Sequence, residues 1–299
     1  MRRGLHQRDM SDVWLKGGIG VFVTLFTLLC FYPFFYIVIN SLSSAKAVRS
    51  GVFLYPKEWD LSSYVNFFKR NDIGQAFFIS VARTVSGTLI TLLCSSLLGY
   101  VFSQRKMLFR AFFYRLVICT MYISAGLIPW YLTMRMYNLR DSFLLYILPG
   151  AVSAYYMVLL KTYFEQLPAS LEESASLEGA GVFTIFFRIV LPLSTPILAT
   201  IAVYAAVGQW NAWQDAYFLV NNKNLRPVQL MLYNYLNEAE RIASAMRSGA
   251  QAGENMRDAI SPETVRMTII VITVFPILTV YPMVQKYFTK GIMIGAIKG

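Results

Sequence analysis

The chain has 299 residues, of which 56% are hydrophobic and only 14% charged, and its mean hydropathy is +0.49. A soluble domain of this composition would leave far too much apolar surface in water. The formal net charge of +11 is spread over tails and loops, which indicates a topology-setting role and not nucleic-acid binding. We therefore expect an all-α polytopic membrane protein surrounded by a lipid bilayer.

Apolar runs of roughly membrane-spanning length recur along the chain. A helix needs about 20 apolar residues to cross a hydrocarbon core about 30 Å thick. The runs lack the alternation of inward and outward residues that the strands of a barrel would show. We predict one transmembrane domain over residues 1–299 with six spans, at 17–39, 78–102, 112–134, 143–163, 197–220 and 267–288.

The first run could instead be a signal peptide, because Ala45-Lys46-Ala47 after it resembles a cleavage site. A signal core has about 7 to 15 apolar residues, and this run is much longer. We expect it to stay attached as the first span.

Basic residues in the short connections set the predicted orientation. Cytoplasmic loops carry an excess of Lys and Arg. They are dense in the amino-terminal tail and between the second and third spans, at Arg2, Arg3, Arg8, Lys16, Arg105, Lys106, Arg110 and Arg115. Both termini and the loop 164–196 are then cytoplasmic, and 40–77 and 221–266 are external. The opposite orientation stays open, because the external segments also carry several cations.

Catalytic and metal-binding patterns are missing from the sequence. The single histidine, His6, lies in the basic tail, and no G-x-x-x-x-G-K-[ST] phosphate loop occurs. Cys30, Cys94 and Cys119 are odd in number and lie within apolar spans, as packing residues do. We therefore predict no catalytic residue, no metal site and no cofactor in this chain, so that any ATP is hydrolysed by another subunit.

A polar insert, residues 167–196, interrupts the apolar sequence. Pro168 ends the preceding helix, and Ser170-x-x-Glu173 has the spacing of a capping box that begins a short helix. Gly179 is expected to stop this helix in the left-handed conformation, and Gly181 loosens the chain again.

A second helix is expected over 182–190, followed by Pro192 and Pro196 at the entry to the fifth span. The small residues Ala175, Gly179 and Ala180 leave room for a partner's backbone, and Leu171 and Phe183 offer apolar side chains. An ordinary interfacial helix resting on headgroups has the same composition, so composition alone leaves both alternatives open.

This insert resembles the EAA loop of ABC importer permease subunits. The resemblance rests on the spacing of Glu173-Ser174-Ala175, Glu178-Gly179-Ala180, Phe186, Ile189, Pro192 and Pro196. Ser174 replaces the usual alanine and Glu178 the commoner aspartate. The resemblance implies a type I importer permease fold, in which the loop between spans 4 and 5 docks on a nucleotide-binding subunit through Leu171, Glu173, Ser174, Ala175, Glu178, Gly179 and Ala180.

Further motifs are similar to the maltose-type carbohydrate permeases. They are Phe53-Leu54-Tyr55-Pro56 with Leu61-Ser62-Ser63-Tyr64, Leu97-Leu98-Gly99-Tyr100, Asn138-Leu139-Arg140-Asp141-Ser142, and the tail Gly291-x-x-x-Gly295-Ala296-Ile297-Lys298-Gly299. The resemblance implies a sugar importer in a bacterial plasma (inner) membrane. Its other parts would be a second homologous permease subunit, two nucleotide-binding subunits that hold ATP and Mg, and an extracytoplasmic solute-binding protein.

The end of the fifth run offers candidate substrate residues. Trp210 and Asn211 resemble the family's Trp-Asn pair, and Trp213, Gln214 and Asp215 follow. Aromatic rings cover the C–H face of a sugar while amides and carboxylates bind its hydroxyls. For Trp213, a place in the aromatic belt at headgroup level is the alternative. An ionised acid at lipid depth costs roughly 2.5 to 3.5 kcal/mol, so we expect Asp215 to face the pathway or the outer vestibule.

The segment 221–266 is too long for a simple turn, and helical spacing is expected over 230–246, with Pro262 near re-entry. The family resemblance implies that it contacts the binding protein. Cations in or beside it could favour an acidic sugar such as an alginate oligomer, or serve only solubility: Arg241, Arg247, Arg257 and Arg266.

Two other functions for the protein stay open, an importer of peptides or amino acids and an ion-coupled secondary carrier. A secondary carrier would carry acids at mid-span and an internal repeat, and neither is evident in the sequence.

Overall fold

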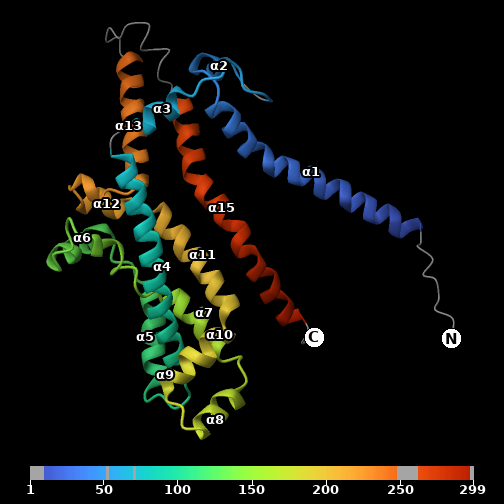
Figure 1. Ribbon diagram of the computed structural model, residues 1–299, viewed down its shortest axis with the longest axis vertical. Helices are drawn as coiled ribbons and strands as arrows, with labels where there is room; N and C mark the ends of the chain where they lie inside the picture. Colours follow the sequence, from blue (N-terminus) through green and yellow to red (C-terminus); the bar gives the residue numbers. More distant parts are fainter. Residues whose placement is uncertain (1–9, 52–53, 70–71, 248–261, 297–299) are drawn as a thin grey trace. The chain divides into compact units, whose positions relative to one another are not determined.

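The computed structural model describes residues 10–51, 54–69, 72–247 and 262–296 (Figure 1). Some residues used above lie outside this part, namely Arg2, Arg3, His6, Arg8, Phe53, Arg257 and Ile297 to Gly299. The chain divides into two compact units. One comprises residues 1–68 with 235–272, and the other residues 69–234 with 273–299.

The first unit contains a long apolar helix near the amino terminus. It comprises α1 (Met10–Ser41), α2 (Ala45–Ser50) and α3 (Ser62–Phe68), with the end of α13 (Val228–Arg247) and the start of α15 (Pro262–Ala296). Ser44 caps α2 by accepting a hydrogen bond from the amide of Ala47 at 3.1 Å. Buried Phe67 packs against Tyr235, with ring centroids 5.8 Å apart.

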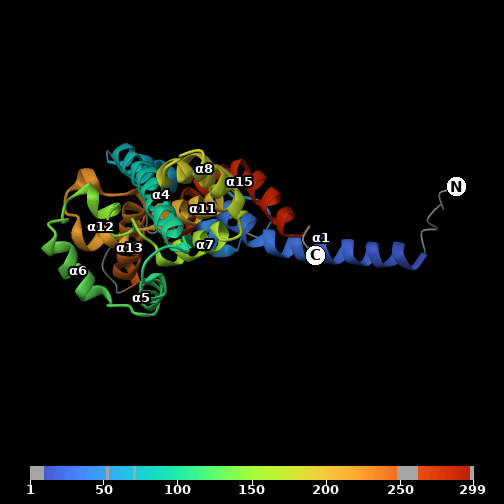
Figure 2. The same cartoon turned by 90° about the horizontal axis from the view of Figure 1, so that it is seen from below.

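The second unit is built around α4 (Ile73–Ser103), which packs along α7 (Ala154–Phe164) and α11 (Thr195–Asn211), and both views show these three side by side (Figures 1 and 2). Its other elements are α5 (Arg110–Tyr122), α6 (Leu127–Met136), η1 (Phe143–Tyr146), α8 (Ala169–Leu177), α9 (Val182–Ile185), η2 (Phe186–Val190), α10 (Leu191–Leu193), α12 (Gln214–Leu219) and η3 (Lys223–Leu225).

Gly99 sets how closely α4 approaches α7. A Cβ atom at this position would lie 2.9 Å from Cβ of Leu160, 3.2 Å from the backbone nitrogen of Lys161 and 3.2 Å from the carbonyl of Met157. Such distances leave no room for a side chain, so the glycine allows the two backbones to meet.

Three helical segments of the described chain are long and apolar enough to cross a membrane: Leu15–Ser41, Ile73–Ser103 and Pro262–Thr279. They match the predicted first, second and sixth spans. Two bent helix pairs would raise the number to five if each is one span. One is α5 with α6, bent by 118° inside the predicted third span, and the other joins 182–193 to α11 at 81°. The predicted number of six spans is therefore larger than the three to five that the described residues contain.

The predicted fourth span, 143–163, is α-helical only from Ala154 onward. Pro149 and Gly150 interrupt it, because proline lacks an N–H donor and disfavours helix at the residue before it. The freed backbone groups pair with hydroxyls of α4. Thr91 Oγ1 donates to the carbonyl of Gly150 at 2.7 Å, and the amide of Ser153 donates to Ser95 Oγ at 3.3 Å. Non-helical backbone at membrane depth requires such partners.

The predicted fifth span, 197–220, is also divided. Helix α11 ends at Asn211, Ala212 and Trp213 leave the helical conformation, and α12 begins at Gln214. This break lies among the residues predicted to contact substrate, and its stabilisation by α4 is described below.

Candidate functional site

The loop 164–196 forms a helix, a sharp turn and a second helix, as predicted. Helix α8 begins at Ala169, after Pro168 at φ −60° and ψ 122° without a side-chain cap. The predicted capping box at Ser170 and Glu173 is therefore wrong. Pro168 already has the extended conformation that an N-cap requires, so Ser170 falls inside the first turn.

Gly179 ends α8 with a left-handed backbone at φ 84°. Its amide donates to the carbonyl of Ser176 at 3.1 Å, and the amide of Ala180 donates to the carbonyl of Ala175 at 3.0 Å. These two bonds make up a Schellman motif, the commonest ending that needs a glycine. The prediction that Gly179 stops the helix is confirmed.

The second helix of the loop contains a π turn. Residues 186–190 form η2, and the amide of Leu191 donates to the carbonyl of Phe186. Pro192 has no N–H for the carbonyl of Arg188, which favours widening of the turn just before it. The chain then bends by 81° into α11.

The inner side of α8 is anchored to the end of α4. Ala175 and Ala180 pack against the cluster that contains Tyr100 and Phe186, whose rings lie 5.1 Å apart. Glu172 accepts hydrogen bonds from Gln104 Nε2 at 3.0 Å and from Tyr100 Oη at 3.4 Å. Ala175 and Ala180 are thus partly buried against this chain itself.

The outer side of the loop exposes large apolar side chains. Leu177 is 90% exposed, Phe183 72%, and Leu171 41%. Glu173, Ser174 and Glu178 are also exposed. Two leucines and two polar residues on consecutive turns of α8 and its end form an exposed surface that nothing in the described chain covers: Leu171, Ser174, Leu177 and Glu178.

An ion network lies at the end of α7. Glu165 pairs with Arg110 and with Lys161, whose Nζ lies 2.9 Å from the carboxylate, and Lys161 stands over the ring of Tyr114 at 4.5 Å. Burial alone would raise the pKa of Glu165, but its hydrogen bonds and the charges of Lys161 and Arg110 hold that pKa below its usual value. The Glu165 carboxylate therefore stays ionised at neutral pH.

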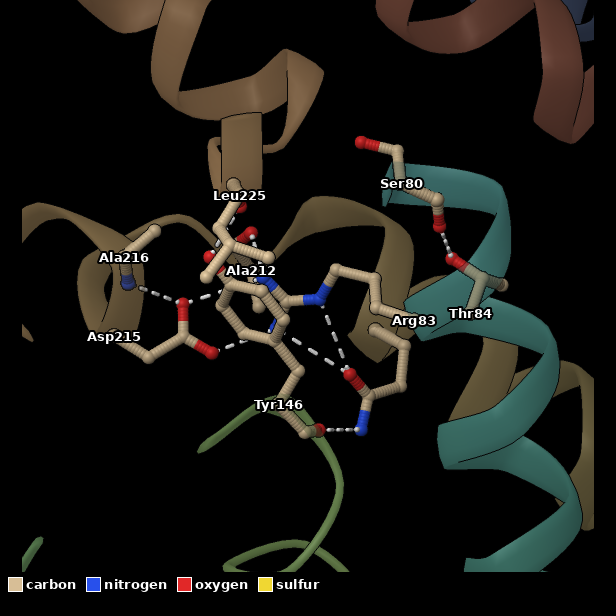
Figure 3. Close-up of polar contacts among 9 residues, drawn as sticks. Ser80, Arg83, Thr84, Tyr146, Ala212, Asp215, Ala216 and Leu225 are labelled. Atoms are coloured by element: carbon tan, nitrogen blue, oxygen red, sulfur yellow. Dashed lines mark hydrogen bonds and ion pairs between the residues drawn. The ribbon is translucent and has the colours of Figure 1, made fainter. Parts of the chain in front are cut away.

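Arg83 of α4 occupies the break between α11 and α12 (Figure 3). It is 1% exposed. Its Nη2 donates to Asp215 Oδ2 at 2.7 Å and its Nη1 donates to Asp215 Oδ1 at 3.3 Å. Nη1 also donates to the carbonyl of Ala212 at 3.1 Å, and Nε and Nη2 donate to Gln209 Oε1 at 3.4 and 3.3 Å. A carbonyl freed by the end of α11 is thus satisfied by the guanidinium.

Neighbouring residues fix the guanidinium in place. The ring of Tyr146 lies 4.2 Å from its central carbon, and Tyr146 Oη donates to the carbonyl of Leu225 at 2.7 Å. Gln209 donates from Nε2 to the carbonyl of Tyr146 at 3.2 Å. Gly87, one turn beyond Arg83, leaves the space for Gln209, since a Cβ there would lie 2.7 Å from its Cδ.

Two cavities adjoin this cluster. One of about 450 Å³ is lined by Leu127, Trp130 and residues 211–215. The other, of about 390 Å³, is lined by Arg83, Tyr146, Tyr156, Tyr204 and Gln209 among others. Trp130, Ala212 and Asp215 line both. Aromatic rings beside amides, a carboxylate and a guanidinium are the groups that bind sugars.

Four of the five predicted pathway residues line the 450 Å³ cavity: Asn211, Trp213, Gln214 and Asp215. Trp213 also stacks on Tyr233, with centroids 4.1 Å apart. Trp210 lies elsewhere. It is 7% exposed, packs near Phe77 and donates from Nε1 to the carbonyl of Thr273 at 3.2 Å, so its place is in helix packing.

Sequence reasoning missed Arg83, Tyr146, Gln209 and Glu172. Arg83 had a signal, because it is an arginine inside an apolar run, and ionisable residues at membrane depth are usually functional. Tyr146, Gln209 and Glu172 had no such signal in the sequence, since only the packing of α4 against distant segments brings them to these sites. Of the arginines in or beside the predicted external segment, Arg266 pairs with Glu240 at 2.8 Å and is exposed.

Known proteins resemble the chain over nearly its whole length. No family model matches. The polygalacturonan/rhamnogalacturonan transport system permease protein YtcP of Bacillus subtilis (strain 168) is 36% identical over 282 residues, 93% of this chain and 96% of that protein. Protein LplC of the same organism is 33% identical over 97% of this chain and 95% of its own length. A crystal structure of a bacterial ABC transporter involved in the import of the acidic polysaccharide alginate matches with a TM-score of 0.77 and 32% identity, covering 96% of this chain and 100% of the matched one.

Proposed function

The chain belongs to the permease subunits of binding-protein-dependent carbohydrate ABC importers, and from this membership we propose that it forms part of a pathway for an acidic oligosaccharide. As a permease subunit of a bacterial importer it is a multi-pass membrane protein and not itself an enzyme. Its partners are an ATPase that binds ATP, a second permease and a binding protein.

The loop 164–196 is the proposed contact with the ATPase. Leu171, Glu173, Ser174, Glu178 and Gly179 are exposed along α8 and its end. Closure of the ATPase would push α8, and α8 would pass the movement to α4 through Glu172 and to α11 through the bend after Pro192. Ala175 and Ala180 support this surface from within. Under this proposal the loop and both termini are cytoplasmic.

The two cavities beside Arg83 are the proposed substrate pathway. Asn211, Trp213, Gln214 and Asp215 supply amides, an aromatic ring and a carboxylate to one of them. Outside the membrane, the segment 221–266, with α13, is proposed to contact the binding protein. The two ATPase copies and a homologous second permease complete the transporter.

The buried guanidinium of Arg83 at the wall of a cavity is the observation that carries the proposal of an acidic substrate. Arginine binds carboxylates through a two-bond fork. Two of the similar proteins point the same way. One is named for the transport of polygalacturonan and rhamnogalacturonan, and the other is a transporter involved in the import of the acidic polysaccharide alginate.

ATP hydrolysis by the reconstituted complex tests this proposal. With the binding protein present, uronate oligomers are expected to stimulate hydrolysis severalfold, and neutral oligosaccharides and oligopeptides of the same length to stimulate it much less. The physical reason is that only a bound ligand that fits the pathway stabilises the conformation in which the ATPase closes. Stimulation by neutral sugars alone, or by peptides alone, would contradict the acidic substrate.

A further inference from the structure

We infer that Arg83 and Asp215 form a latch between the two cavities, and that a substrate carboxylate opens it by replacing Asp215 on the guanidinium. The inference rests on the proposed acidic substrate and adds the residues that select it. It starts from the position of the ion pair. Asp215, Ala212 and Trp130 line both cavities, so the two cavities adjoin at these residues.

A substrate that occupies both cavities lies beside the residues that they share. Each cavity is in the lower part of the range that holds a drug-sized ligand. An oligosaccharide chain that passes from the 450 Å³ cavity to the 390 Å³ cavity lies against Asp215 on its way. Ala212 lies in the break between α11 and α12, where the backbone has left the helix, and Asp215 lies in the first turn of α12.

The hydrogen bonds of Arg83 explain why the ion pair with Asp215 holds when no substrate is present. A guanidinium has five N–H donors. Those of Arg83 are directed to Gln209 Oε1, to the carbonyl of Ala212 and to both oxygens of Asp215. Removing Asp215 without replacement would leave a buried charge unpaired, which is strongly unfavourable.

A uronate carboxylate can take the place of the Asp215 carboxylate without that cost. It offers the same two-oxygen fork and the same charge, so the buried guanidinium keeps its hydrogen bonds and a paired negative charge. A neutral sugar hydroxyl offers neither. The latch would therefore open for acidic units and stay closed to neutral ones.

The two partners differ in how free they are to move. The side chain of Arg83 is 2% exposed and is fixed by Tyr146 and Gln209, whereas that of Asp215 is 17% exposed. Asp215 lies on α12, a helix of six residues. It is thus the partner that leaves, while Arg83 remains as the anion-binding group.

Uptake by proteoliposomes that contain the complete complex and its binding protein tests the latch, with trigalacturonate and its methyl ester as probes. In the double variant Arg83→Met with Asp215→Leu, no buried charge is left unpaired, and such exchanges are often tolerated. We expect the ratio of trigalacturonate to ester uptake to fall by about tenfold or more, the usual effect of losing a hydrogen bond to a charged group. The binding protein's own preference cancels when this ratio is compared with the wild-type ratio.

The single variant Asp215→Asn provides a second measurement, should the double variant fail to assemble. It keeps Arg83 and replaces the competing carboxylate by a weaker, neutral acceptor, so the same ratio is expected to rise. An unchanged ratio in either variant overturns the latch, and this includes an equal loss of uptake of both probes. Uptake of the ester but not of trigalacturonate by the wild-type complex overturns the acidic substrate itself.

Discussion

Replacing Gly179 by valine is expected to reduce sugar uptake by the reconstituted complex to background while the chain is still inserted in the membrane. Gly179 has φ 84°, a conformation that costs an L-residue about 1 to 2 kcal/mol, and a β-branched residue more. No atom lies within 4 Å of the position of its Cβ, so the effect comes from the backbone and not from a clash. The valine would undo the Schellman motif and displace the exposed end of α8.

Gly181→Val is the matched control. Gly181 lies two residues further on, also has no atom within 4 Å of its Cβ position, and has φ −73° and ψ 161°, which valine adopts readily. Sugar uptake by the Gly181→Val complex is expected to stay within about twofold of wild type, since surface substitutions at positions without a special backbone conformation change stability little. Equal uptake by the two variants would show that the turn at Gly179 does not carry the coupling.

Replacing Gly99 by leucine is expected to remove most of the folded chain from the membrane. The added Cβ alone would lie 2.9 Å from that of Leu160, and two backbone atoms of α7 lie only slightly further away. Because α4 and α7 form the core of their unit, the helices would have to separate along their length. Overpacking of this kind costs typically 1 to 3 kcal/mol, and more where backbone must move. The measurement is the amount of monodisperse complex after solubilisation.

Gly74→Leu in the same helix is the control for this loss. Gly74 is exposed and has no neighbouring atom within 4 Å of its Cβ position. Leucine is a better helix former than glycine, so the yield of complex is expected to be equal to wild type or higher. If Gly99→Leu gave the wild-type yield, the close approach of α4 and α7 would not be needed for folding.

Local sequence patterns predicted the parts of the fold that local forces determine. The helices α1, α4 and α15 follow from long apolar runs, because each must satisfy its own backbone in lipid. Gly179 was identifiable as the end of α8, because the turn needs a left-handed residue. The predicted start of that helix was wrong, since Pro168 competes with Ser170 for the N-cap position and has the more suitable backbone.

Tertiary contacts determined the rest, and those are not visible in a single sequence. The break after Asn211 contains no proline or glycine, and it is held by Arg83, which lies 129 residues before Ala212 in the chain. The interruption at Pro149-Gly150 had a local signal, but its apolar neighbours suggested a continuous span. Trp210 and Asn211 are adjacent in sequence, yet one is buried against Thr273 and the other lines a cavity.

Site-specific crosslinking from α8 is the measurement that tests most directly whether this chain is driven by a separate ATPase. Leu177, which is 90% exposed, would be replaced by cysteine after the native Cys30, Cys94 and Cys119 are changed to alanine. In the complete complex we expect a photoreactive probe attached to this cysteine to join the chain to the ATPase subunit, with a yield that changes when ATP is added. Crosslinks to lipid alone, with and without ATP, would contradict a coupling role for this helix.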